Sequence, residues 1–259
     1  MTFTAVIIMI LVALVYEFFI VGHLAKLTTR VYLHSSLTHF SFKLKRPSEM
    51  FFRIICWLLL GSIPREFAGV HRKHHKYTDV EGDPHSPFLE GYWKIQLGNL
   101  FYYQREAAKI DLNYWAKGVP DYGWLDRHSN LGLLVGFLLS CLIFGLLGAV
   151  MGLGFFVGTA FGAGAHFILA VDYLLCTGAV NGLCHKRGYK TFKDVEAYNN
   201  RFVALLSCGE GLHNNHHKYQ SSPKMRTGDR WFEFDLGWTC IKFLDRIGQI
   251  ESKGPEWPE

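Results

Sequence analysis

Residues 131–180 read LGLLVGFLLSCLIFGLLGAVMGLGFFVGTAFGAGAHFILAVDYLLCTGAV, and this stretch decides the class of fold. Within it, His166 and Asp172 are the only residues of the types His, Asp, Glu, Lys and Arg. At helical rise the stretch would reach about 75 Å, roughly twice what one crossing of the bilayer core needs. We therefore expect two membrane-spanning helices, at about 131–151 and 155–180, joined by a tight turn near Met151–Gly154.

Two further apolar segments lie upstream. The segment at about 3–24 is long enough for a third span and is interrupted only by Glu17. No basic region precedes it and no small-x-small cleavage pattern ends it, so we expect a retained anchor rather than a signal peptide. The segment at about 50–63 contains Arg53 and is followed by Pro64. Its uninterrupted apolar part is too short for a crossing, which favours an amphipathic helix at the membrane interface.

Composition and charge support the same class. The chain has 259 residues, of which 49% are hydrophobic, and a formal net charge of +5, which is too small to indicate nucleic-acid binding. Lys and Arg are absent from residues 1–25 and 128–185. The connecting turn therefore carries no positive charge, and the opposite face is expected to be cytosolic, in a bacterial inner membrane or the endoplasmic reticulum. We expect an all-α integral membrane protein, a single domain over 1–259, with a cytosolic helical cap.

Nine of the thirteen histidines fall in four places on that cytosolic face. The segments HRKHH (71–75) and GEGLHNNHH (209–217) each contain an H-x-x-H-H pattern. On a helix, residues three and four apart share a face while adjacent residues diverge by about 100°, so each pattern can direct imidazoles toward two neighbouring metal ions. The nine candidate ligands are His34, His39, His71, His74, His75, His185, His213, His216 and His217.

The spacing of the remaining candidates is less regular. His34 and His39 are five residues apart, about 140° on a regular helix, so they would serve one metal each or lie where a helix ends. A structural zinc site normally closes with four ligands, often cysteine, and none of the six cysteines forms C-x-x-C. Imidazole suits iron, copper, zinc and nickel, so the ligand type does not name the metal. Nine ligands indicate two ions with positions left open for a small molecule such as O₂.

Four segments, HSSLTH, HRKHH, VNGLCH and GEGLHNNHH, resemble in this order the membrane fatty acid desaturase family, and most closely its acyl-CoA desaturases of the stearoyl-CoA type. The segments DPH (83–85), GY (188–189) and RW (230–231) resemble that family as well. The resemblance implies two ferrous ions held by the nine histidines, with Asn181 reaching one iron through a water. It also implies activation of O₂, two electrons from outside, and a double bond formed in a fatty acyl chain.

Two further residues have expected roles beside the metal. Glu210, between two glycines, is expected to orient a ligand histidine, the alternative being a turn cap. His85 resembles a family position that does not bind metal and is expected to lie just behind the ligands. The chain departs from the family in having Ser35 after the first histidine, Gly178 where a tryptophan is common, and one span fewer than the usual pattern.

Several alternatives and partners follow. A membrane di-iron hydroxylase shares such histidine patterns and would release an alcohol instead of an alkene. A non-catalytic metal-binding or metal-transporting membrane protein would carry histidines or acids along its spans. The sequence has no HPGG-like haem segment. We therefore expect an external electron donor of the cytochrome b5, ferredoxin or rubredoxin type, docked by Lys and Arg around the histidines.

Overall fold

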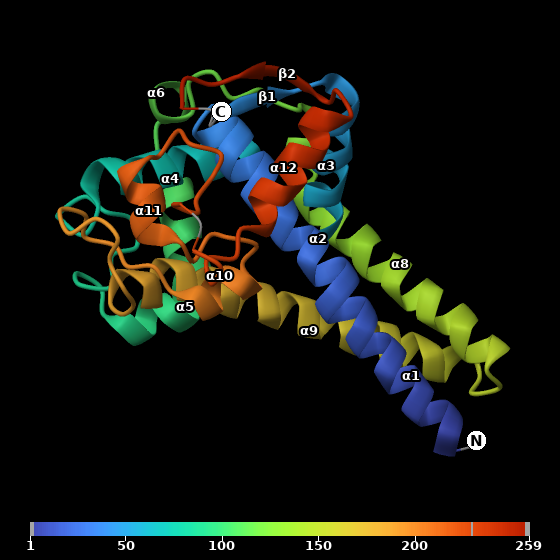
Figure 1. Cartoon of the computed structure of the whole chain (residues 1–259). Helices are drawn as coiled ribbons and strands as arrows, with labels where there is room; N and C mark the ends of the chain where they lie inside the picture. Colours follow the sequence, from blue (N-terminus) through green and yellow to red (C-terminus); the bar gives the residue numbers. More distant parts are fainter. Residues whose placement is uncertain (1–2, 229, 257–259) are drawn as a thin grey trace.

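Three continuous helical stretches among the described residues are long and apolar enough to cross a membrane: 3–38, 129–150 and 155–185. They extend together to one end of the molecule, where the N-terminus lies, while the other helices gather at the opposite end (Figure 1). The computed structural model describes residues 3–228 and 230–256. The prediction of three spans in an all-α membrane fold is confirmed.

The elements are, in chain order, α1 (Phe3–Val15), the π-helix η1 (Tyr16–Val21), α2 (Gly22–Leu27), the π-helix η2 (Thr28–Thr38), β1 (Phe42–Leu44), α3 (Arg46–Leu59), α4 (Pro64–Tyr77), α5 (Tyr92–Ala107), α6 (Leu112–Trp115), α7 (Trp124–Arg127), α8 (Ser129–Val150), α9 (Phe155–Asn181), the 3-10 helix η3 (Leu183–His185), α10 (Arg201–Leu206), α11 (His213–Lys218), α12 (Leu236–Arg246) and β2 (Ile250–Lys253).

The first helix continues beyond the predicted end of its span at residue 24. It runs without a break through α2 and η2 to Thr38, because the polar residues that follow the apolar run are buried against protein. The Lys26 ammonium lies 2.7 Å from the Asp172 carboxylate of α9. This contact places Asp172 on the interior side of the bundle, and Glu17 is likewise buried. Burial of paired charges lets the helix continue past the apolar run without unwinding.

The helices α8 and α9 pack closely through small residues. A Cβ atom added to Gly158 would meet the Phe144 carbonyl oxygen at 2.1 Å, and one added to Gly162 would meet the Ser140 carbonyl oxygen at 2.5 Å. Ser140 Oγ also donates a hydrogen bond to the carbonyl of Gly162 at 3.0 Å. Small residues at such a crossing let two membrane helices approach backbone to backbone. The close approach therefore depends on Gly158 and Gly162, but not on Gly164, whose Cβ position is open.

We expect Gly158→Ala to destabilise the helix pair, because the new methyl group overlaps a backbone carbonyl that cannot move aside. Overpacking of this kind costs about 1–3 kcal/mol, or several degrees in the midpoint of thermal denaturation in detergent. Gly164→Ala is the matched control on the same helix, since no atom lies within 4 Å of its Cβ position. A fall of equal size in both variants would contradict this account.

The helices that gather at the end of the molecule opposite the N-terminus form the cap, which packs on the C-terminal half of the first helix (Figure 1). Its core packs Tyr32 and Leu33 of η2 against Phe52 of α3, Ala68 of α4 and Ile241 of α12. The short antiparallel pair β1–β2, which was not predicted, joins the chain after η2 to residues near the C-terminus. Helix α3 lies at 46–59, earlier than the predicted 50–63, since Pro47 fits the first turn of a helix and Gly61, at φ 59°, follows its end. Its place at the membrane interface stays a prediction.

Candidate metal centre

The π-helix η2 places the first two histidines. His39 donates its backbone N–H to the carbonyl of His34 at 3.1 Å, an i to i+5 bond that widens the last turn of the helix. Residues five apart then share a face, and the two ring centroids are 4.6 Å apart. The expectation that each histidine serves a different metal is wrong in this geometry. The alternative is confirmed, because His39 directly follows the helix end at Thr38.

The two H-x-x-H-H segments lie on α4 and α11, and in each helix the adjacent histidines diverge as predicted. The nine histidines form two groups whose ligand nitrogens lie within 4.8 Å of one another in each group. The five-histidine cluster contains His34, His39, His71, His75 and His216. The four-histidine cluster contains His74, His185, His213 and His217. The clusters adjoin, since the rings of His75 and His217 have centroids 4.5 Å apart.

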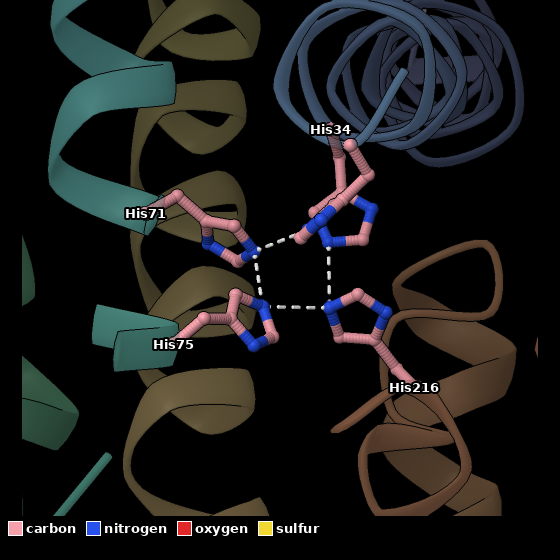
Figure 2. Close-up of side chains that lie close together, drawn as sticks. His34, His71, His75 and His216 are labelled. Carbon is pink, nitrogen blue, oxygen red and sulfur yellow. Dashed lines mark hydrogen bonds between the residues drawn. The ribbon is translucent and has the colours of Figure 1, made fainter. Parts of the chain in front are cut away.

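The distances between the imidazole nitrogens fit metal coordination. In the five-histidine cluster, Nε2 of His216 lies 3.1 Å from Nε2 of His34 and 2.9 Å from Nε2 of His75 (Figure 2). In the four-histidine cluster, Nε2 of His213 lies 2.9 Å from Nε2 of His185. With metal–nitrogen distances of about 2.1 Å, two ligands at right angles are about 3.0 Å apart. The converging Nε2 atoms therefore match the donor set of a metal ion.

Two aspartates fix the orientation of histidines in the four-histidine cluster. Nδ1 of His74 donates to Asp83 at 3.0 Å, and Nδ1 of His185 donates to Asp79 at 2.8 Å. A proton held on Nδ1 leaves the lone pair on Nε2, the tautomer that binds metal. Nε2 of His74 is buried without a hydrogen-bond partner among the described residues, as this arrangement requires.

Asp79 was missed in the sequence, and Asp83 appeared there only in the DPH segment. The available signal was two aspartates within nine residues of the HRKHH segment, because carboxylates commonly support ligand histidines. The Nδ1 partners depend on the folding of the loop after α4, so the spacing alone did not assign them.

Burial keeps the candidate ligands neutral. It lowers the pKa of His39 to about 3, assisted by Arg72 and Arg30, from an ordinary value of 6.5. It also lowers the pKa of His85 to about 3, with a further contribution from His74. The pKa values of His71, His75, His213, His216 and His217 also lie well below the ordinary value, chiefly because of burial. Neutral imidazole is the form that binds metal.

Acidification is therefore expected to destabilise the metal-free protein. Below pH 6.5 the histidines of the unfolded chain bind protons, whereas the buried rings of the folded chain stay unprotonated. The unfolded state is therefore favoured as the pH falls. Each ring costs about 1.4 kcal/mol per pH unit between 6.5 and its own low pKa. The midpoint of thermal denaturation of the metal-free protein should change little from pH 7.5 to 6.5 and fall steeply from pH 6.5 to 5.5. A midpoint that does not change over this range would contradict the burial of neutral histidines.

Glu210 and His85 both border the clusters. Oε1 of Glu210 lies 3.3 Å from Nδ1 of His34 and 3.6 Å from Nε of Arg30, so the carboxyl group stands behind a candidate ligand. Burial raises the pKa of Glu210 to about 8, although Arg30 opposes the shift. His85 stacks on His74 with centroids 4.6 Å apart, and neither of its ring nitrogens has a hydrogen-bond partner among the described residues.

A largely apolar cavity of about 280 Å³ borders the five-histidine cluster, where His34 and His71, together with His85, form part of its wall. Leucines, Val70, Val180 and Tyr173 from α3, α4, α5, α8 and α9 line much of the rest, and polar groups such as Lys26 and Glu210 also border it. Asn181 also lines the cavity, and its side chain donates to Asn99 at 3.0 Å. Helix α9 ends at Asn181 and His185 follows in a 3-10 turn, so the four-residue spacing between them is not that of one regular helix.

Comparison with known proteins gives consistent matches. The family model described as fatty acid desaturase matches residues 7–231. The chain is 33% identical over 216 residues to an sn-1 stearoyl-lipid 9-desaturase of Synechocystis sp., a match that covers 83% of this chain and 63% of the relative. It is 34% identical over 221 residues to an icosanoyl-CoA 5-desaturase of Limnanthes douglasii, covering 83% of this chain and 57% of the relative. The chain thus spans about three fifths of the length of these relatives.

Proposed function

The chain belongs to the fatty acid desaturase family, and on that premise we propose that it is an O₂-dependent di-iron enzyme that introduces a double bond into a fatty acyl chain. The observation that carries the proposal is the position of the five-histidine cluster, which the four-histidine cluster adjoins, at the wall of an apolar cavity. Such a cavity binds an acyl chain by the hydrophobic effect and brings its methylenes beside the clusters.

The proposed reaction removes one hydrogen from each of two adjacent methylenes. O₂ accepts four electrons. Two come from the alkyl chain, which loses two hydrogens, and two come from the donor; two further protons are taken up, and two waters leave. Two iron ions, held by the five- and four-histidine clusters, would supply the redox chemistry that activates O₂. Imidazole ligands suit this metal.

The chain's own residues would orient and shield the centre. Asp83 and Asp79 hold His74 and His185 in the tautomer that directs Nε2 inward. Glu210 stands behind His34 and orients it, while Asn181, which lines the cavity, would reach one iron through a water. The apolar walls exclude bulk water from a reactive oxidant, which prevents its loss to side reactions. His85 packs against His74 and keeps that ring in place.

The partners proposed are a fatty acyl substrate, the bilayer and an external electron donor. The relatives' names include both a stearoyl-lipid and an icosanoyl-CoA substrate, so the proposal covers an acyl chain on either carrier. A donor of the cytochrome b5, ferredoxin or rubredoxin type would dock on the cytosolic face, where Lys and Arg surround the histidines.

The decisive experiment is lipid profiling of cells that express the chain, compared with cells that express His217→Ala. We expect acyl chains that have lost two hydrogens in the first culture and not in the second. Acyl chains that gain one oxygen instead would show that the protein is a membrane di-iron hydroxylase and not a desaturase. An unchanged profile together with bound metal would favour a non-catalytic metal-binding protein.

Asp83→Asn is expected to weaken the metal centre without unfolding the chain. The amide cannot accept the Nδ1 proton of His74 as a carboxylate does, so the ring loses basicity and fixed orientation, and metal affinity should fall about 10–100-fold. Competition with a chelator, followed by iron analysis, measures the change. Asp194→Asn is the matched control, since this aspartate pairs with Lys218 on the surface. Equal iron retention by both variants would show that Asp83 does not support the metal centre.

A further inference from the structure

A second cavity, of about 550 Å³, lies on the outside of the cap where the first helix enters it. Its wall includes His23 of α2, Leu205 of α10, residues 224, 226, 231 and 233–235 of the loop before α12, and the first turns of α12. Helix α12 lies beside α2 (Figure 1). This cavity shares no lining residue with the apolar cavity at the histidine clusters.

The cavity presents a positive charge. Lys224, Arg226 and Lys242 line it, and none of the three forms an ion pair within the part of the chain that the structure describes. Nε of Arg226 is buried and lacks a hydrogen-bond partner there. Unpaired cations gathered in one concave site attract an anion.

The two acids in the wall do not cancel this charge, because both are turned inward. Glu233 accepts from the backbone N–H of Thr227 at 2.7 Å, and Asp235 accepts from those of Met225 at 2.7 Å and Trp238 at 2.9 Å. The side chains of both acids have 0% exposure. Both carboxylates face groups inside the protein: Glu233 faces the Thr227 backbone, and Asp235 faces the Arg30 guanidinium. A ligand that enters from outside therefore meets the two lysines and Arg226 first.

The rim of the cavity is apolar and aromatic. Trp231 is 82% exposed, and Leu205, Phe234 and Leu236 are also exposed at the same opening. An exposed tryptophan beside basic side chains is typical of the boundary between lipid headgroups and acyl chains. A soluble anion alone would leave this apolar rim in water.

The first helix indicates the level, relative to the membrane, at which the cavity lies. His23 lies within the apolar helical stretch 3–38, three residues before Lys26, the first basic residue of the chain. One turn earlier on the same helix, Phe19 is 74% exposed and Ile20 is 56% exposed. The cavity therefore sits at the cytosolic boundary of the proposed membrane region, next to a helix surface that suits acyl chains.

We propose that this cavity binds the phosphate-bearing headgroup of an anionic phospholipid. The phosphate lies among Lys224, Arg226 and Lys242, Trp231 packs at the glycerol level, and the acyl chains run along Phe19 and Ile20. The same cations would also attract a soluble phosphate ester, but the apolar rim and the continuity with the first helix favour the lipid. The site goes beyond the proposed desaturase reaction and does not depend on it.

The test uses the full chain, reconstituted in vesicles of equimolar phosphatidylglycerol and phosphatidylcholine and then released for native mass spectrometry. We expect bound phosphatidylglycerol to exceed bound phosphatidylcholine. The preference should fall about five-fold for each cation replaced by glutamine and more than ten-fold for Lys224→Gln, Arg226→Gln and Lys242→Gln together.

Controls separate the charge from the fold. The swap of Lys224→Arg, Arg226→Lys and Lys242→Arg should keep the preference, as should glutamine at the exposed lysines Lys43, Lys94 and Lys117, which lie outside the cavity. Equal lipid ratios in the wild type and the triple glutamine variant would overturn the proposal. Displacement of the lipid by millimolar inorganic phosphate, with no preference left, would also overturn it in favour of a soluble phosphate compound. The readout does not involve activity, so its failure is distinct from a failure of the proposed function.

Discussion

His216→Ala is expected to abolish double-bond formation and to halve the metal content. Nε2 of His216 is in contact with Nε2 of both His34 and His75, and α11 contributes no other histidine to the five-histidine cluster. Loss of residues that merely support a ligand costs about 10–100-fold, so loss of a ligand should cost more than about 100-fold in activity. His213 and His217, on the other face of α11, would still hold the second ion.

Iron analysis and product mass spectrometry on the same preparation measure both effects. His128→Ala is the matched control, because His128 is exposed and lies outside both clusters. Its iron content and product yield should equal those of the unaltered chain. Two ions per chain and normal yield in His216→Ala would refute the division of the histidines into five and four. Loss of both ions would instead mean that the clusters bind metal as one unit.

Arg30→Met should produce the largest loss of stability. The Arg30 side chain is fully buried, donates to the Pro223 carbonyl at 2.7 Å and contacts Ser35, and it lies 3.6 Å from Glu210 and 3.5 Å from Asp235. It therefore joins the first helix to the loops on both sides of α11 and to the start of α12. Removing it leaves two buried carboxyl groups without their cation, which costs about 3–5 kcal/mol.

The midpoint of thermal denaturation in detergent should fall on the order of 10 °C in Arg30→Met. Arg30→Lys should recover only part of the loss, since an ammonium group cannot serve several acceptors in one plane as a guanidinium does. Arg46→Met is the control, because Arg46 is 68% exposed in a surface pair with Glu49. A loss of similar size at Arg46 would show that arginine deletion is harmful in general, and not that Arg30 joins these elements.

Much of the architecture could be predicted from local patterns. The spans at 131–151 and 155–180, with their turn at Met151–Gly154, agree with α8 and α9, because a run of apolar residues must find an apolar environment wherever it lies in the chain. The divergence of adjacent histidines on α4 and α11 was likewise predictable, since it depends only on the 100° step of a helix.

Other features depended on contacts between distant segments. The regular-helix spacing of His34 and His39 gave the wrong grouping, because packing of η2 in the cap stabilises π-helical turns that a propensity argument does not foresee. The first helix was predicted to end near residue 24, yet Lys26 and Arg30 find partners on α9 and near α12 that lie more than 140 residues away. The cavity lined by Lys224, Arg226 and Lys242 also depends on contacts between distant segments, and for that reason it was not predicted.

The sequence by itself therefore determined the membrane class, the three apolar helices and the set of histidines, because hydrophobicity and helical spacing act over a few turns. Only the tertiary structure decided how nine histidines divide into five and four, which aspartates support them, and where Arg30 joins the first helix to the cap. These depend on which helix faces which, and that is set by the packing of the whole chain.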